Sequence, residues 1–164
     1  MGITTVNNYL CKEGYYCPDG VSEVKCPAGT YWKLLGADDL SDCLDCPPGY
    51  YCPTDATVKP IPCIGGTYCP VNSTAMLDCM QSFFCHEKSA VQTDCPEAYY
   101  CPTDNVDIYT KCDNNYYCPL NSIDQTITPC PDGMIGNSNP NNFDVPSSCE
   151  NCPAGKYTNS SVLG

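Results

Sequence analysis

The sequence is short of the residues that build a hydrophobic core. Only about one residue in six is Leu, Ile, Val or Phe, and a highly charged chain with less than roughly 20% of these residues is normally disordered. The net charge is -12 at pH 7. Hydrophobic collapse alone is therefore not expected to fold this chain, and another force must hold it in shape.

Arginine is absent, and long apolar runs are absent too. The basic residues are lysines only, seven against 19 acidic residues, and this balance excludes nucleic acid as a partner. No apolar run approaches the roughly 20 residues that cross a bilayer, so we expect no membrane span in this segment.

Histidine is nearly absent, which limits catalysis. His86 is the one histidine, and beside Cys85 it suggests a Cys–His dyad. We favour a surface histidine next to a disulfide cysteine instead. Paired acids at a catalytic spacing are also missing. We expect no enzyme, no catalytic residue, no metal site and no cofactor.

Cysteine, in contrast, is abundant. It makes up 17 of 164 residues, a share typical of disulfide scaffolds in oxidising compartments. Zinc fits poorly, since the C-x2-C pairs Cys43/Cys46 and Cys149/Cys152 have no second pair at zinc-finger spacing. We therefore expect an extracellular protein, secreted or on the cell surface.

Two further features concern ligands and glycans. Asp38, Asp39, Asp42 and Asp45 gather in one stretch, which makes calcium conceivable, but EF-hand spacing is absent and we favour a solvated loop. The triplets Asn72-Ser-Thr and Asn159-Ser-Ser are acceptors for N-linked glycans. O-linked glycans on the loops rich in Thr, Ser and Pro are a second class of expected modification.

The strongest signal is an internal repeat. A C-x5-C unit that ends in one or two aromatic residues begins at Cys11, Cys46, Cys63, Cys79, Cys95 and Cys112. From Cys46 onward these units follow at a period of 16 or 17 residues. A longer module, C-P-x-G followed by a loop and C-x2-C, spans Cys26 to Cys46 and Cys130 to Cys152.

The repeat divides the whole chain. We predict a lead-in from a preceding module (1–10), a short repeat (11–25), a long module (26–45), five short repeats (46–129), a long module (130–151) and an incomplete module (152–164). Gly-Tyr-Tyr before a cysteine predicts short strands that pair as hairpins. Residues 31–36 are the stretch with a helical pattern, of one turn or two.

The predicted fold is small and disulfide-rich. Tandem β-hairpin modules are expected to stack into an elongated rod, with little helix and no large hydrophobic core. Two pairing schemes remain open. The first, which we favour, closes each unit on itself as Cys11–Cys17, Cys26–Cys43, Cys46–Cys52, Cys63–Cys69, Cys79–Cys85, Cys95–Cys101, Cys112–Cys118 and Cys130–Cys149, and leaves Cys152 unpaired. The second shifts every pair by one cysteine, beginning with Cys17–Cys26.

The aromatic pairs before the second cysteines are candidates for an assembly surface. Alternation along a strand sends one ring towards the disulfide and its neighbour outward, towards the next module or a partner chain. A carbohydrate-stacking role is the alternative. The candidate residues are Tyr15, Tyr16, Tyr50, Tyr51, Phe83, Phe84, Tyr99, Tyr100, Tyr116 and Tyr117.

The long modules resemble the cysteine-rich repeats of ephrin-receptor-like and tumour-necrosis-factor-receptor-like ectodomains. The resemblance rests on the C-P-x-G…C-x2-C pattern and covers about a quarter of the chain. It implies the pairs Cys26–Cys43 and Cys130–Cys149, an extended rod and no catalysis. The short C-x-x-G-Y-Y-C-P units resemble tandem repeats of protist surface and flagellar-hair (mastigoneme-like) proteins. They lack the receptors' interlocked extra bridges.

Two functions are therefore expected from the sequence. In the first, the chain is a structural glycoprotein, a building block of a surface filament or fibril whose partners are itself and neighbouring repeats. In the second, it is a ligand-binding or adhesive receptor-like ectodomain segment whose partners are other extracellular proteins.

Overall fold

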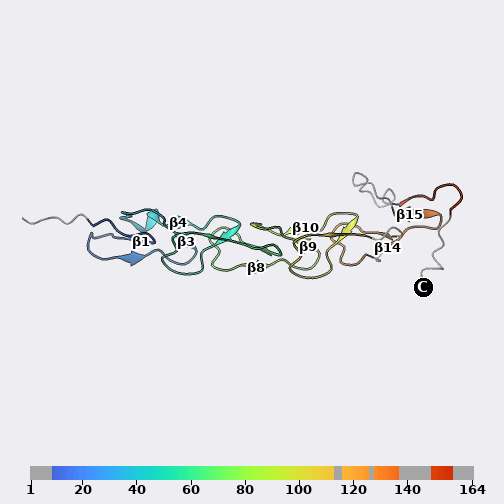
Figure 1. The fold of residues 1–164 in the computed structure, drawn as a ribbon. Coiled ribbons are helices and arrows are strands. Elements are labelled where there is room, and N and C mark those ends of the chain that lie inside the picture. Colours follow the sequence, from blue (N-terminus) through green and yellow to red (C-terminus); the bar gives the residue numbers. More distant parts are fainter. Residues whose placement is uncertain (1–8, 113–115, 126–127, 137–148, 157–164) are drawn as a thin grey trace, which may run out of the picture. The chain divides into compact units, whose positions relative to one another are not determined.

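A computed structural model describes residues 9–112, 116–125, 128–136 and 149–156. Its strands form eight separate two-stranded antiparallel sheets, drawn as short arrows between loops in Figure 1. The pairs are β1 (Tyr15–Tyr16) with β2 (Val24–Lys25), β3 (Thr30–Tyr31) with β4 (Leu44–Asp45), β5 (Tyr50–Tyr51) with β6 (Ile61–Pro62), β7 (Thr67–Tyr68) with β8 (Leu77–Asp78), β9 (Phe83–Phe84) with β10 (Thr93–Asp94), β11 (Tyr99–Tyr100) with β12 (Thr110–Lys111), β13 (Tyr116–Tyr117) with β14 (Thr128–Pro129), and β15 (Met134–Gly136) with β16 (Cys149–Asn151).

The sequence explains why each hairpin forms where it does. Its first strand is typically a pair of aromatic or β-branched residues, which favour extended backbone. Its second strand usually lies directly before the first cysteine of the next unit, as in the pairing of Tyr15 with Lys25 and Tyr16 with Val24. Proline commonly follows the cysteines and removes a backbone donor, so that most of these strands are only two residues long.

The helical expectation for residues 31–36 is wrong. Tyr31 belongs to β3, and the one helical element among the described residues is the 3-10 turn η1 (Leu40–Asp42). Asp39 is the N-cap of η1 and forms a capping box with Asp42. Gly36 adopts φ 84°, a left-handed conformation that ends any helical run before it could form a second turn.

Sulfur takes the place of a hydrophobic core. Apart from Ala37, every buried apolar residue in the described part of the chain is a cysteine, and ten cysteines are at most 1% exposed. Large aliphatic side chains lie outside, for example Ile108 at 69% and Ile64 at 60% exposure. The chain therefore folds without the buried aliphatic layer that holds ordinary domains together.

Eight disulfides join cysteines with Cα–Cα distances between 5.6 and 6.3 Å, within the usual range for such bridges. Six of them span a sequence separation of 6 residues, and the two long-module bridges span 17 and 19. They are the pairs of the first scheme, and Cys152 forms no disulfide. A bridge of this length closes its own unit and leaves each junction between units to noncovalent contacts.

The chain divides into two compact units. The first comprises 1–63 and 69–77, and the second 64–68 and 78–164. Each contains consecutive hairpins of the repeat, and the elongated rod stays a prediction. Within the described ranges, no helix has the length and apolar character needed to cross a membrane.

Candidate functional site

Each short unit whose turn lies within the described residues contains the same tight turn. The fourth residue after the first cysteine of the unit donates its N–H to the carbonyl of the residue that follows that cysteine, as Tyr50 does to Pro47 at 3.1 Å and Tyr99 does to Pro96 at 3.2 Å. The third residue after the cysteine, which we call position 3, has positive φ in every described unit and is usually glycine. The turn presents the backbone groups of position 3 to the next unit.

Position 3 makes the first contact of a repeated junction. The N–H of Gly29 donates to the carbonyl of Cys52 at 2.9 Å, and the Gly29 carbonyl accepts from the N–H of Cys46 at 2.8 Å. In the second compact unit of the chain, the N–H of Gly66 likewise donates to the carbonyl of Cys85 at 2.8 Å, and the Gly66 carbonyl accepts from the N–H of Cys79 at 3.0 Å. The same residue therefore fixes the next hairpin on two sides.

A loop residue in left-handed conformation makes the second contact. It follows the second cysteine of a unit, or Trp32 in the long module, by three or four residues, and its N–H donates to the carbonyl of the first cysteine of the preceding unit. The pairs are Gly36 to Cys11 at 2.7 Å, Ala56 to Cys26 at 2.8 Å, Asn72 to Cys46 at 2.9 Å, Asn105 to Cys79 at 2.7 Å and Asn121 to Cys95 at 2.9 Å. Consecutive hairpins are thus interlocked by backbone hydrogen bonds that any sequence with the correct φ angles can make.

The junction also reaches one unit further. A Cβ added to Gly66 would lie closer than 3.0 Å to the backbone carbonyl of Asn105, and one added to Gly29 would lie 2.8 Å from the carbonyl of Asn72. Both glycines have left-handed φ, 83° and 85°. Glycine is required here both for its φ angle and for the close approach of another loop.

Sequence reasoning missed the role of Trp32. It occupies the position of a second cysteine in the pattern Cys26-Pro-Ala-Gly-Thr-Tyr-Trp32. Its carbonyl accepts from the N–H of Gly14 at 2.9 Å and its N–H donates to Thr57 at 3.0 Å, as Cys52 does with Gly29 and Ser73. The long module is a short unit whose second cysteine is replaced by Trp32, while Cys43 supplies the bridge. Aligning Cys26–Trp32 with Cys46–Cys52 would have revealed this.

Asparagine side chains add hydrogen bonds to two junctions in the second compact unit. The Asn121 carbonyl oxygen Oδ1 accepts from the N–H of Cys95, and its Nδ2 donates to the carboxylate of Asp94, both at 3.0 Å. With its amide nitrogen facing them, Asn105 lies 3.0 Å from the carboxylate of Asp78 and 2.9 Å from the carbonyl of Gly66. We call this arrangement the Asn–Asp clamp.

The ten candidate aromatic residues all lie on the first strands of hairpins and are all half-buried. The second ring of each pair faces an aliphatic residue or threonine across the hairpin, as Tyr51 faces Ile61 and Tyr100 faces Thr110. Lys12 places its ammonium 4.1 Å from the centre of the Tyr15 ring. All ten residues are therefore partly exposed, and the assembly-surface hypothesis stays a prediction.

One group of aromatic rings connects two hairpins of the second compact unit. The Tyr109 ring packs edge-on against Phe84 at 4.9 Å and against Tyr99 at 4.7 Å between ring centres. His86 packs against Phe84 at 5.0 Å. Its neighbour Cys85 is bonded to Cys79, so the thiol that a Cys–His dyad needs is absent from this structure.

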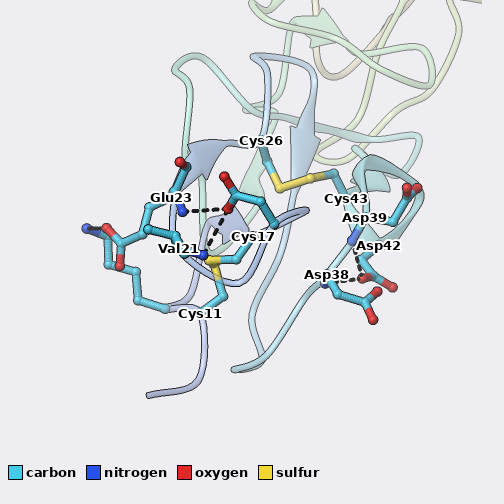
Figure 2. The surroundings of a disulfide bond; sticks show 12 residues. Cys11, Cys17, Val21, Glu23, Cys26, Asp38, Asp39, Asp42 and Cys43 are labelled. Carbon is cyan, nitrogen blue, oxygen red and sulfur yellow. Dashed lines mark hydrogen bonds and ion pairs between the residues drawn. A yellow bond between two sulfur atoms is a disulfide. The ribbon is translucent and has the colours of Figure 1, made fainter. Parts of the chain in front are cut away.

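Two of the four aspartates considered for calcium, Asp39 and Asp42, accept hydrogen bonds from backbone N–H groups, and Figure 2 shows those of Asp42. The Asp42 carboxylate accepts from the N–H of Asp38 at 2.9 Å and of Asp39 at 3.2 Å. Asp39 accepts from the N–H of Ser41 at 2.8 Å, which lowers the pKa of its carboxyl. Asp45 is exposed on β4. Within the described residues, no three His, Cys, Asp or Glu side chains form a group that could hold a metal ion.

The two glycan acceptors have different outcomes. Asn72 is exposed in a loop of the first unit. Asn159 lies outside the described residues.

Comparisons with known proteins give partial matches. No protein-family model matches the chain. It is 28% identical over 114 residues to putative white-brown complex homolog protein 30 of Arabidopsis thaliana, a match that covers 50% of this chain and 10% of that protein. It is 28% identical over 115 residues to ABC transporter G family member 25 of Oryza sativa subsp. japonica (51% and 11%), and 32% identical over 84 residues to ABC transporter G family member 28 of Arabidopsis thaliana (51% and 7%). The chain spans about a tenth of the length of these relatives.

Proposed function

We propose that the chain is an extracellular structural segment, a disulfide-stapled and glycosylated repeat that serves as a building block of a surface filament or fibril, without enzymatic activity. The observation that carries the proposal is the repeated junction: within the described residues, hairpins with their own bridges are interlocked by the same backbone hydrogen bonds at one junction after another. A unit of this kind adds to its neighbour in one way, which suits linear propagation.

Two properties support the extracellular part of the proposal. Eight disulfides and a core made of sulfur would be unstable in a reducing cytosol. The surface is acidic, with a net charge of -12, which keeps an extended chain soluble before assembly. The partners in this proposal are other copies or neighbouring repeats.

Electron microscopy of the secreted protein tests the proposal. We expect regular filaments in material purified without reductant, and their loss after reduction of the disulfides. The filament proposal is wrong if the oxidised protein gives only isolated particles at every concentration, with a mass by light scattering that stays that of one chain.

A second function is favoured by two observations. The first is the ring group of Phe84, Tyr99 and Tyr109, which differs from the regular repeat. The second is that the relatives named as ABC transporters match this chain only over a small part of their own length. In this alternative the chain is a ligand-binding or adhesive ectodomain segment of a larger protein. Isolated particles that bind an extracellular protein, with loss of binding on Tyr109→Ala, would favour it over the filament.

A further inference from the structure

Three asparagines occupy the same place in the repeated junction. Asn72, Asn105 and Asn121 have φ angles of 62°, 61° and 62°. Each donates its backbone N–H to the first cysteine of the preceding unit, at 2.9, 2.7 and 2.9 Å. Their backbones are therefore equivalent, and any difference between them lies in what the side-chain amide does.

The amides differ. Asn105 and Asn121 use theirs in the Asn–Asp clamp, with Asp78 and Asp94 as partners. Asp45 stands directly before Cys46, where Asp78 and Asp94 stand before their own cysteines. Asn72 and Asn105 are both exposed, but within the described residues no hydrogen bond engages the amide of Asn72. One of three equivalent amides is thus available to a reagent.

The available amide is also the one in a glycan-acceptor triplet. Asn72 is followed by Ser73 and Thr74, whereas Asn121 is followed by Ser122 and Ile123 and has no hydroxyl at the required third position. The Ser73 hydroxyl donates to the carbonyl of Pro70 at 2.7 Å, and the Ser73 carbonyl accepts from the N–H of Cys52 at 2.8 Å. The loop backbone is held while the side chain of Asn72 stays in solvent.

We propose that Asn72 carries an N-linked glycan, and that the Asn–Asp clamp takes the equivalent amide elsewhere in the repeat. The inference rests on the proposed extracellular location. In the transfer step, Asn72 Nδ2 forms a bond to the anomeric carbon of an oligosaccharide carried on a lipid pyrophosphate. The bond from that carbon to the pyrophosphate oxygen breaks, the lipid pyrophosphate leaves with the electron pair, and the amide loses one proton to solvent.

One side-chain amide cannot both carry a glycan and form the clamp. A glycosylated amide keeps one N–H and gains a bulky substituent, so it no longer fits between the N–H of Cys95 in the preceding unit and the Asp94 carboxylate, each 3.0 Å away. At Asn72 the backbone bonds to Cys46 and Cys52 already hold the loop. A glycan can therefore be attached there without loss of a junction contact.

Mass spectrometry of the chain secreted from eukaryotic cells tests this inference, with Asn159→Gln introduced throughout so that one acceptor remains. We expect a glycan on Asn72 that an amidase for N-linked glycans removes, leaving Asp at that position. Thr74→Ala should abolish the glycan and leave the melting temperature of the enzymatically deglycosylated protein unchanged. Because Thr74 is exposed, this variant removes the acceptor without altering the left-handed residue.

The matched variant moves the acceptor to a clamped position. Ile123→Thr places a hydroxyl two residues after Asn121 and so completes an acceptor triplet there. We expect either several-fold lower occupancy at Asn121 than at Asn72 or a lower melting temperature of the glycosylated form. Equal occupancy with an unchanged melting temperature would overturn the role of the clamp. A secreted chain with all eight bridges and an unmodified Asn72 would overturn the glycan and leave the filament proposal standing, whereas a glycosylated chain that never forms filaments would do the reverse.

Discussion

At position 3 of the repeat we expect glycine to stabilise the folded chain, whereas glycine usually destabilises regular structure. Gly66 adopts φ +83°, and a Cβ added there would lie closer than 3.0 Å to the Asn105 carbonyl. Ser82 and Ala98 hold the same place in their units with φ 73° and 67°, although they carry a side chain. Gly66→Ala should therefore destabilise the chain, while Ala98→Gly and Ser82→Gly should stabilise it.

The magnitudes follow from the backbone. The left-handed conformation costs an L-residue about 1–2 kcal/mol in the folded state. Replacing Ala by Gly also makes the unfolded chain more flexible, which lowers the free energy of unfolding by about 0.4–1 kcal/mol. Ala98→Gly should thus raise the free energy of unfolding by up to about 1.6 kcal/mol. Gly66→Ala has the same net conformational cost and adds an overpacked contact of about 1–3 kcal/mol, so a loss of about 1–4.6 kcal/mol is expected.

Urea unfolding with the disulfides intact, followed by near-ultraviolet circular dichroism, measures both changes. The two substitutions are inverse and exchange the same methyl group, so each controls for the other. The reasoning is refuted if Ala98→Gly lowers the midpoint by as much as Gly66→Ala does, because position 3 would then obey ordinary propensity.

Three further predictions follow from the junctions and loops. Trp32→Cys combined with Cys43→Ser should convert the long module into a short one, in which non-reducing peptide mapping finds Cys26 bridged to the cysteine introduced by the first substitution; a free Cys26 thiol would disprove the equivalence. Asn121→Gly keeps the left-handed conformation but removes two clamp hydrogen bonds, and should lower the free energy of unfolding by about 1–2 kcal/mol in urea titration, with no change if the clamp is idle. The Asp19 carboxyl accepts two backbone N–H groups, which lower its pKa from 3.8 to about 2; its stabilising effect is therefore present above pH 3.8 and lost as the pH falls through about 2, and an NMR titration with an ordinary midpoint would contradict this.

The hairpins and their bridges could be predicted because their signals are local. A spacing of six residues between Cys46 and Cys52, with Tyr50 and Tyr51 before the second, leaves little choice of turn. The aromatic pair favours extended backbone and the flanking prolines end it. Cysteine content likewise indicated that bridges replace a hydrophobic core.

The junctions could not be predicted, because their contacts use backbone groups of loops with dissimilar sequences. The N–H of Ala56 reaches the carbonyl of Cys26, far back along the chain, and nothing in Pro-Thr-Asp-Ala resembles the loop that Asn72 provides for Cys46. Ala56 also adopts φ 56°, which its residue type does not suggest. The role of Trp32 could not be predicted for the same reason, because only its backbone groups make the contacts that the second cysteine makes in a short unit.

Amide hydrogen exchange before and after reduction with alkylation tests the central claim, that disulfides supply the rigidity of this chain. Each short bridge is worth about 2–3 kcal/mol through the unfolded state, and the junction amides of Gly29, Gly66 and Asn121 lie between bridged hairpins. We predict strong protection of these amides in the oxidised protein and exchange at unfolded rates once the cysteines are reduced and blocked. Protection that survives reduction would contradict the account.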